Sequence, residues 1–293
     1  MIIIEEGGIA ILFSNALVRT PGHSVIDGID DYANLGQTDY PTALAQHQAY
    51  VALLKDRGVT VTVLDPLEAF PDSCFVEDPA VVAADFAVIT NPARASRTPE
   101  RSFIRPALEH FYSQDHIFEI TAPGHLEGGD VMEVDGTYYV GLSARTNREG
   151  FEQFKAIAAQ FNHPALAVPV HDFLHLKTGT TYLGDGKLLV TGEFVNHPAF
   201  ANFTQLVVPA EEAYAVNCIN TGNGVIMPAG FPVVKQLLED HGFPVFEAAM
   251  SEFEKMALCQ ILLMGHFRRR PVLAPDAAFF LLPFPFDAIG SGR

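Results

Sequence analysis

The feature that most constrains the fold of this chain is a repeated unit of two short apolar strands joined by a tight turn. Three of the turns contain Asp-Gly or Asn-Gly pairs, which accept positive φ angles at low cost. The unit recurs at intervals of roughly 40 to 50 residues, within residues 75–90, 126–140, 175–190 and 217–227. Repeats of this size predict small sheets stacked around an axis in a closed, propeller-like array.

Helical patterns and further strands separate these hairpins. Apolar residues at helical spacing predict helices, and the apolar runs that follow predict a third strand for each unit. The predicted helices are 43–56, 149–161 and 232–241, and the predicted third strands are 59–64, 117–120, 166–170 and 244–246. The unit is therefore strand, strand, helix, strand, used about five times. Because loops at one end of such an array meet near its axis, we expect a site there.

The charge balance argues against two classes of partner. The chain has 35 Asp and Glu residues against 18 Lys and Arg, a formal net charge of -17, whereas nucleic acids and anionic membranes bind clustered cations. An acidic surface instead weakly favours a cationic partner. We therefore predict a small-molecule ligand and neither nucleic acid nor membrane as a partner.

The cysteines and the amino terminus predict a cytoplasmic protein. Cys74, Cys218 and Cys259 are too few for a disulfide framework, as is typical of a reducing compartment. Residues 1–6 contain acids where a signal peptide needs Lys or Arg. No apolar run approaches the roughly 20 residues that span a bilayer.

Polar residues cluster where the strands of the repeats begin. The clusters contain Asp72, Glu77 and Asp78, then Glu127 and Asp130, then His175 and Lys177. Each could be an ordinary turn or a satisfied core residue, but their recurrence at equivalent places favours one shared polar centre. Several buried carboxylates need a cation. A single histidine among scattered acids lacks the spacing of a metal site, whereas a guanidinium offers several N–H donors and stays charged. We predict no metal and no cofactor.

Several motifs resemble one known family. They are residues 70–79, Glu127-Gly128-Gly129-Asp130, residues 141–147, residues 174–179, and Asn217-Cys218-Ile219 with residues 225–230. In order and approximate spacing, from about residue 14 to residue 256, they resemble the dimethylarginine dimethylaminohydrolases of the guanidine-modifying, or pentein, superfamily. The resemblance implies an α/β fold, a five-bladed α/β propeller of ββαβ units. It implies one domain over 11–259 and leaves 260–293 as a C-terminal tail of unknown structure, unlike the family.

The resemblance also implies a reaction. A cysteine thiolate attacks the guanidinium carbon of a methylated arginine, an amine leaves, and water releases citrulline from the covalent thiouronium intermediate. By motif position, His175 resembles the general acid/base and Glu127 the carboxylate that orients it. The positions that resemble substrate-binding residues are Asp72, Glu77 and Asp78, the α-carboxylate-binding Arg97 and Arg145, and Ile29 in a lid over 22–39.

The resemblance ends at the segment that carries the nucleophile. Residues 251–256 match the family, but Cys259 falls three residues earlier than the family's catalytic cysteine, and residues 260–293 resemble nothing in it. Cys259 either reaches the centre through a shortened loop, or the sequence after Met256 comes from an altered reading frame without a nucleophile. Arginine deimination, amidino transfer and a catalytically inactive guanidine-binding protein therefore remain alternatives. A homodimer also remains open.

Overall fold

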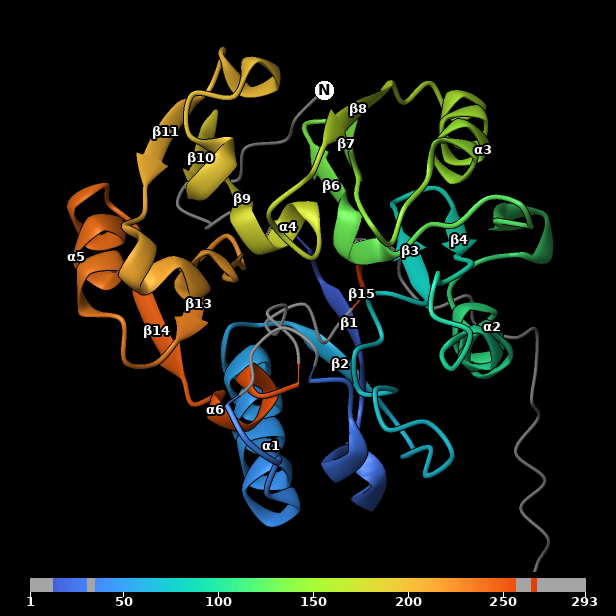
Figure 1. Ribbon diagram of the computed structural model, residues 1–293, viewed down its shortest axis with the longest axis horizontal. Helices are drawn as coiled ribbons and strands as arrows, with labels where there is room; N and C mark the ends of the chain where they lie inside the picture. The colour runs from blue at the N-terminus through green and yellow to red at the C-terminus, as the bar shows by residue number, and fades with distance from the viewer. Residues whose placement is uncertain (1–12, 31–34, 257–264, 268–293) are drawn as a thin grey trace, which may run out of the picture.

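The computed structural model describes residues 13–30, 35–256 and 265–267. Within these ranges, five three-stranded sheets lie in a ring around a common centre (Figure 1). Each sheet joins an antiparallel pair to a third strand that runs parallel to the middle one. This arrangement confirms the predicted α/β propeller.

Four of the sheets are made of consecutive strands. They are β3 (Ala80–Val82), β4 (Ala87–Ile89) and β5 (Ile117–Glu119); β6 (Val131–Val134), β7 (Thr137–Leu142) and β8 (Ala165–Pro169); β9 (Thr180–Gly184), β10 (Lys187–Val190) and β11 (Thr204–Val207); and β12 (Ile219–Asn220), β13 (Val225–Pro228) and β14 (Val245–Ala248). Two of their turns have the expected geometry, since Asp135 and Asp185 have φ angles of 48° and 50° and each is followed by a glycine with positive φ. Hence the local turn chemistry sets the register of these hairpins.

The remaining sheet joins distant parts of the chain. β1 (Asn15–Arg19) pairs in parallel with β2 (Thr60–Leu64) and antiparallel with β15 (Gly265–Phe267). β15 falls within the segment 260–293 that the sequence assigns to a tail, and the rest of that segment lies outside the described residues. The ring is therefore completed by a strand that follows the family-like part of the sequence.

Helices connect the second and third strands of most sheets and lie on the outer side of the ring (Figure 1). They are α1 (Tyr40–Asp56), α2 (Arg101–Leu108), α3 (Arg148–Ala159) and α5 (Pro232–Asp240), with the short α4 (Leu176–Gly179) and α6 (Ser251–Glu254) elsewhere. Side chains cap α1 and α3, because Asp39 accepts from Thr42 N at 3.0 Å and Asn147 from Gly150 N at 2.8 Å. No helix in the described ranges is long and apolar enough to cross a membrane.

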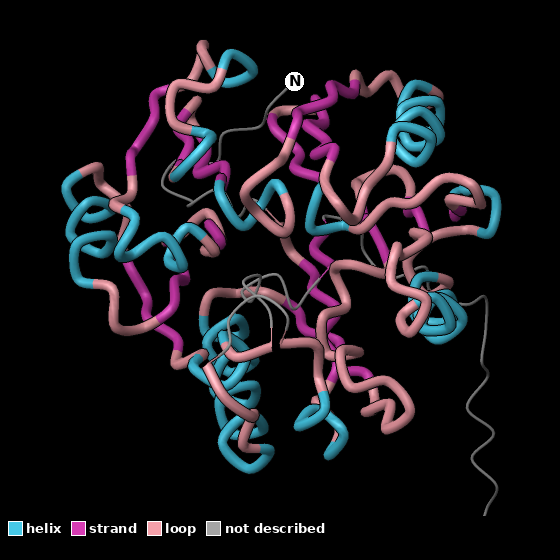
Figure 2. Tube along the Cα trace, in the orientation of Figure 1, coloured by secondary structure: helices cyan, strands magenta, loops and turns pink. Residues whose placement is uncertain are grey.

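The sheet of β9, β10 and β11 departs from the predicted unit. Between β10 and β11 the chain forms two 3-10 turns, Gly192–Phe194 and Pro198–Phe200, in place of an α-helix (Figure 2). Gly192 and Asn196 have positive φ angles of 53° and 56°, which an α-helix excludes. Helix α2, strand β1 and strand β11 were not among the predicted elements.

Candidate active site

The hairpins bring the polar clusters to one place. The start of the first strand and the end of the second lie at the same end of an antiparallel pair, opposite its turn. Glu127 lies before β6 and Arg145 after β7, while His175 precedes α4 and β9. Asp78 lies before β3 and Arg97 after β4. The open ends of neighbouring sheets therefore face one another near the centre of the ring.

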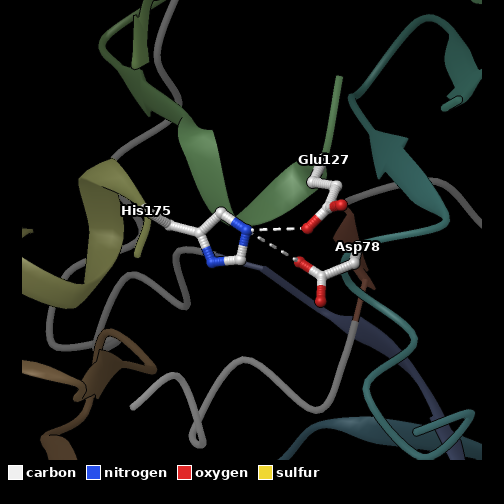
Figure 3. Close-up of side chains that lie close together, drawn as sticks. All are labelled: Asp78, Glu127 and His175. Atoms are coloured by element: carbon white, nitrogen blue, oxygen red, sulfur yellow. Dashed lines mark hydrogen bonds and ion pairs between the residues drawn. The ribbon is translucent and has the colours of Figure 1, made fainter. Parts of the chain in front are cut away.

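Three buried side chains form the core of the site. His175 Nε2 lies 2.9 Å from Glu127 Oε2 and 4.0 Å from Asp78 Oδ1, and the three side chains point toward one another (Figure 3). Glu127 Oε1 accepts from Ala93 N at 3.1 Å, and Asp78 Oδ1 accepts from Gly129 N at 3.2 Å. His175 Nδ1 is buried without a hydrogen-bond partner in the described structure. The imidazole thus has one nitrogen held by carboxylates and one available for proton transfer.

The charge state of His175 follows from these neighbours. Burial lowers its pKa, but Asp130, Asp78 and the Glu127 hydrogen bond outweigh burial and raise the pKa of His175 to about 9. Burial opposes ionisation of Asp78 too, yet His175 and Arg97 more than compensate, so the pKa of Asp78 lies below its usual value. At neutral pH the site holds an imidazolium between carboxylates.

Arg97 is engaged by the protein itself. Its guanidinium binds Glu100 through Nε and NH2 at 3.1 and 3.0 Å, and Asp78 through NH1 at 2.6 Å. NH2 also donates to the carbonyls of Asp72 and Phe75. Burial lowers the pKa of Arg97, but Glu100 and Asp78 raise it well above its ordinary value. Arg97 therefore fixes Asp78 and has little donor capacity left for a ligand.

Arg145 and Asp72 are less committed. Arg145 NH1 lies 3.7 Å from Glu127 Oε1, a long contact that leaves most of its donors for a ligand. Asp72 Oδ1 accepts from Ile29 N at 3.0 Å, which ties the segment after the 3-10 helix at His23–Asp27 to the site. Burial raises the pKa of Asp72. Residues 31–34 of the predicted lid lie outside the described ranges.

Glu77 differs from the other predicted substrate ligands. Its carboxylate forms an ion pair with Lys177 on α4, and its side chain is buried and is not among those that line the cavity. Burial raises the pKa of Glu77 to about 8, against the opposing charge of Lys177. The structure therefore provides Glu77 with a partner from the protein, whereas its role toward a substrate remains a prediction.

A small cavity, partly open to solvent, lies within this cluster. Its polar lining consists of Asp72, Asp78, Arg97, Glu127, Arg145 and His175, and its apolar lining of Ile29, Phe75, Leu174 and Met256. A cavity that combines carboxylates at one part with an available arginine at another suits an amino acid with a cationic side chain.

The sequence predicts no metal at this cluster, although three of its side chains lie close enough together to hold one. Ligand atoms of Asp78, Glu127 and His175 lie within 4.8 Å of one another. However, His175 Nε2, which lies 2.9 Å from Glu127 Oε2, is already used in a hydrogen bond. The arrangement suits a hydrogen-bonding cation better.

Two residues of this network were overlooked or left without a role. Glu100, which binds Arg97, has a buried side chain in a 3-10 turn, and no sequence signal distinguishes it from a surface acid. Asp130 was recognised in the Glu127-Gly128-Gly129-Asp130 motif but not assigned to the site. The predicted nucleophile Cys259 lies outside the described residues. Cys74 and Cys218 are buried free thiols, and burial raises the pKa of both.

Five three-stranded sheets around a cavity lined by carboxylates and arginines define a protein of the pentein fold. The N-terminal domain of ArgZ, an arginine dihydrolase from cyanobacteria, has the same fold, with a TM-score of 0.76 at 19% identity over 86% of this chain and 96% of that domain. A cysteine-to-serine variant of the dimethylarginine dimethylaminohydrolase from Pseudomonas aeruginosa, complexed with citrulline, gives a TM-score of 0.85 at 40% identity over 87% of this chain and 99% of that chain.

Sequence comparisons narrow the class. The family described as "N,N dimethylarginine dimethylhydrolase, eukaryotic" matches residues 31–193. The N(G),N(G)-dimethylarginine dimethylaminohydrolase of Pseudomonas aeruginosa is 42% identical over 245 residues, 84% of this chain and 96% of the relative. Its namesake from Streptomyces coelicolor is 34% identical over 254 residues, 86% and 96% of the two chains. The chain belongs to the dimethylarginine dimethylaminohydrolase family.

Proposed function

We propose that this protein hydrolyses an N-methylated arginine to citrulline and a methylamine through a covalent cysteine intermediate. The observation that carries the proposal is the buried His175–Glu127 pair, 2.9 Å apart, in a cavity that also presents Asp78 and Arg145. The relatives that share 42% and 34% of their residues with this chain are named for that reaction.

The cavity would hold the substrate at both ends. The guanidinium of the substrate donates to Asp78 and Glu127, the acids nearest His175. Asp72 accepts from the α-amino group, and Arg145 binds the α-carboxylate in the bidentate manner of arginine. Arg97 contributes by holding Asp78, because Glu100 and Asp78 already bind its guanidinium.

The chemistry follows from the charge state of His175. A thiolate adds to the guanidinium carbon, and the His175 imidazolium gives its proton to the leaving methylamine as the carbon–nitrogen bond breaks. The neutral imidazole then takes a proton from water as the water attacks the thiouronium carbon. Collapse of that adduct breaks the carbon–sulfur bond and, with loss of the hydroxyl proton to solvent, releases citrulline and regenerates the thiolate. The carboxylates stabilise positive charge throughout.

Cys259 is the proposed nucleophile, and a single substitution tests this assignment directly. Citrulline release from asymmetric dimethylarginine should be measured for the unaltered protein and for Cys259→Ser. Activity in the first and none in the second supports the proposal. Strong activity in both excludes Cys259 as nucleophile.

A catalytically inactive guanidine-binding protein is the second candidate, favoured by the sequence departure after Met256. Absence of citrulline release from the unaltered protein, together with binding of dimethylarginine in calorimetry, would support it. Faster turnover of arginine than of dimethylarginine would instead indicate arginine deimination, and formation of a new guanidino compound with an added amine would indicate amidino transfer.

We also propose that the protein is cytoplasmic and that it forms a homodimer. The buried free thiols Cys74 and Cys218 suit a reducing compartment. Light scattering of the purified chain tests the dimer, and fractionation of the source cells tests the location.

A further inference from the structure

Asp130 is a buried carboxylate to which the proposed reaction gives no role. Its side chain is inaccessible to solvent, and it ends the 3-10 turn Gly128–Asp130 directly before β6. Among the described residues its hydrogen-bond donors are all neutral, namely Ser143 Oγ, Thr146 Oγ1 and Leu176 N. Since burial of a carboxylate among neutral donors is costly, its presence here calls for a physical reason.

One oxygen of Asp130 holds the backbone beside His175. Leu176 N donates to Asp130 Oδ1 at 2.9 Å, and Leu176 is the residue directly after His175 and the first of α4. A Cβ on Gly141 would lie 2.5 Å from Asp130 Oδ1. The carboxylate is therefore packed directly against β7, and it fixes the position at which the histidine side chain leaves the main chain.

The other oxygen of Asp130 holds two further site residues through hydroxyl groups. Oδ2 accepts from Thr146 Oγ1 at 2.7 Å, and that hydroxyl accepts from Glu127 N at 3.2 Å. Oδ2 also accepts from Ser143 Oγ at 2.7 Å, which in turn accepts from Arg145 N at 2.9 Å. Each hydroxyl donates to Asp130 and accepts from the backbone, so their orientation depends on a pure acceptor at Asp130.

We propose that Asp130 is a positioning residue, which holds the backbones of Leu176, Glu127 and Arg145 in one arrangement and places a negative charge within hydrogen-bond distance of the residue after His175. The catalytic consequence rests on the proposed function, whereas the placement and the charge effect do not. Asp130 supplies only part of the electrostatic field at His175. The other charged groups around the histidine are Glu127, Asp78, the Glu77–Lys177 pair, Arg97 and Arg145.

The test is Asp130→Asn. The amide keeps the shape and the acceptor for Leu176 N, but it removes the charge and directs an N–H toward the hydroxyls. In histidine-labelled protein, with the His175 signal assigned by its loss in His175→Ala, the NMR titration midpoint of His175 is expected to fall by about one pH unit. Turnover of dimethylarginine is expected to fall about 10- to 100-fold.

A matched control and two single-hydroxyl variants sharpen the test. Asp135→Asn alters an exposed acid in the turn of the same hairpin, where it accepts from the Tyr182 hydroxyl, and should leave the titration and turnover unchanged. Thr146→Val releases Glu127 N and should lower kcat more than it raises KM. Ser143→Ala releases Arg145 N, the closer of its two backbone donors, and should raise KM more than it lowers kcat. These two variants carry the test if Asp130→Asn does not fold.

The outcomes are distinguishable from failure of the proposed function. If the unaltered protein releases no citrulline, the proposed function fails, but the His175 titration still decides the role of Asp130. An unchanged His175 midpoint in folded Asp130→Asn overturns the inference. The inference is also overturned if Thr146→Val and Ser143→Ala change kcat and KM in the same proportion and differ from the parent otherwise only by a lower melting temperature. That pattern indicates a structural role alone.

Discussion

Replacement of Glu127 by glutamine tests the centre of the site most directly. Glu127 is 1% exposed, and its two oxygens accept from two different donors, His175 Nε2 at 2.9 Å and Ala93 N at 3.1 Å. A carboxamide has one accepting and one donating end. Whichever way the introduced carboxamide turns, its N–H group therefore faces another donor, and the imidazolium loses its charged partner.

The expected size follows from these contacts. A buried hydrogen bond to a charged group contributes about 1.5 to 3 kcal/mol, and one pKa unit corresponds to about 1.4 kcal/mol. The pKa of His175, which its carboxylates raise to about 9 against burial, should fall by about 1 to 2 units in Glu127→Gln. A raised histidine pKa contributes stability that is complete below about pH 6.5 and disappears as the pH rises through about 9.

The assay combines an NMR titration of His175 with urea unfolding at pH 6 and pH 9.5. The difference between the free energies of unfolding of the parent and of Glu127→Gln should be larger at pH 6 than at pH 9.5. Glu133→Gln, an exposed acid that accepts from Gly136 N in the β6–β7 hairpin, is the control and should change neither measurement. An unaltered His175 midpoint, or a stability difference that is equal at both pH values, would refute the reasoning.

Three further predictions follow from individual contacts. His175→Ala should lower citrulline release by about 10² to 10⁴ while the calorimetric affinity for dimethylarginine changes only a few-fold; normal turnover would contradict its role. Gly129→Ala places a Cβ 2.8 Å from His175 Cγ and Nδ1, so turnover should fall by about tenfold or more. Gly124→Ala is the control, because its Cβ would meet Gln153 and the backbone of Gly150 but no residue of the site, and it should retain turnover. Lys177→Met leaves Glu77 buried without its partner. Burial raises the pKa of Glu77 to about 8 against the opposing charge of Lys177, so the carboxylate is charged, and depends on Lys177, mainly above pH 8. Urea unfolding should therefore show a loss of up to about 3 to 5 kcal/mol, larger at pH 9 than at pH 6. The double variant with Glu77→Gln should recover part of it, and no recovery would argue against the pair.

The repeats were predictable because their signals are local. Asp135-Gly136 and Asp185-Gly186 specify turns by their own φ preferences, and short apolar runs beside them indicate the strands. The absence of an α-helix between β10 and β11 was not predicted. Gly192 and Asn196 have positive φ angles in this connection. The pairing of β1 with β15 could not be predicted, because it joins segments about 250 residues apart with no local signal.

The sequence alone also determined which residue types meet at the centre, since each polar cluster lies at the open end of a hairpin. Only the tertiary structure decided their partners. Glu77 and Asp78 are neighbours in the chain, yet one pairs with Lys177 and the other with Arg97. Asp130 belongs to a recognised motif, but its bonds to Thr146 and Leu176 come from other strands and loops. The physical reason is that the cost of burying a charge depends on donors and cations that the fold brings from distant segments, and no local pattern encodes them.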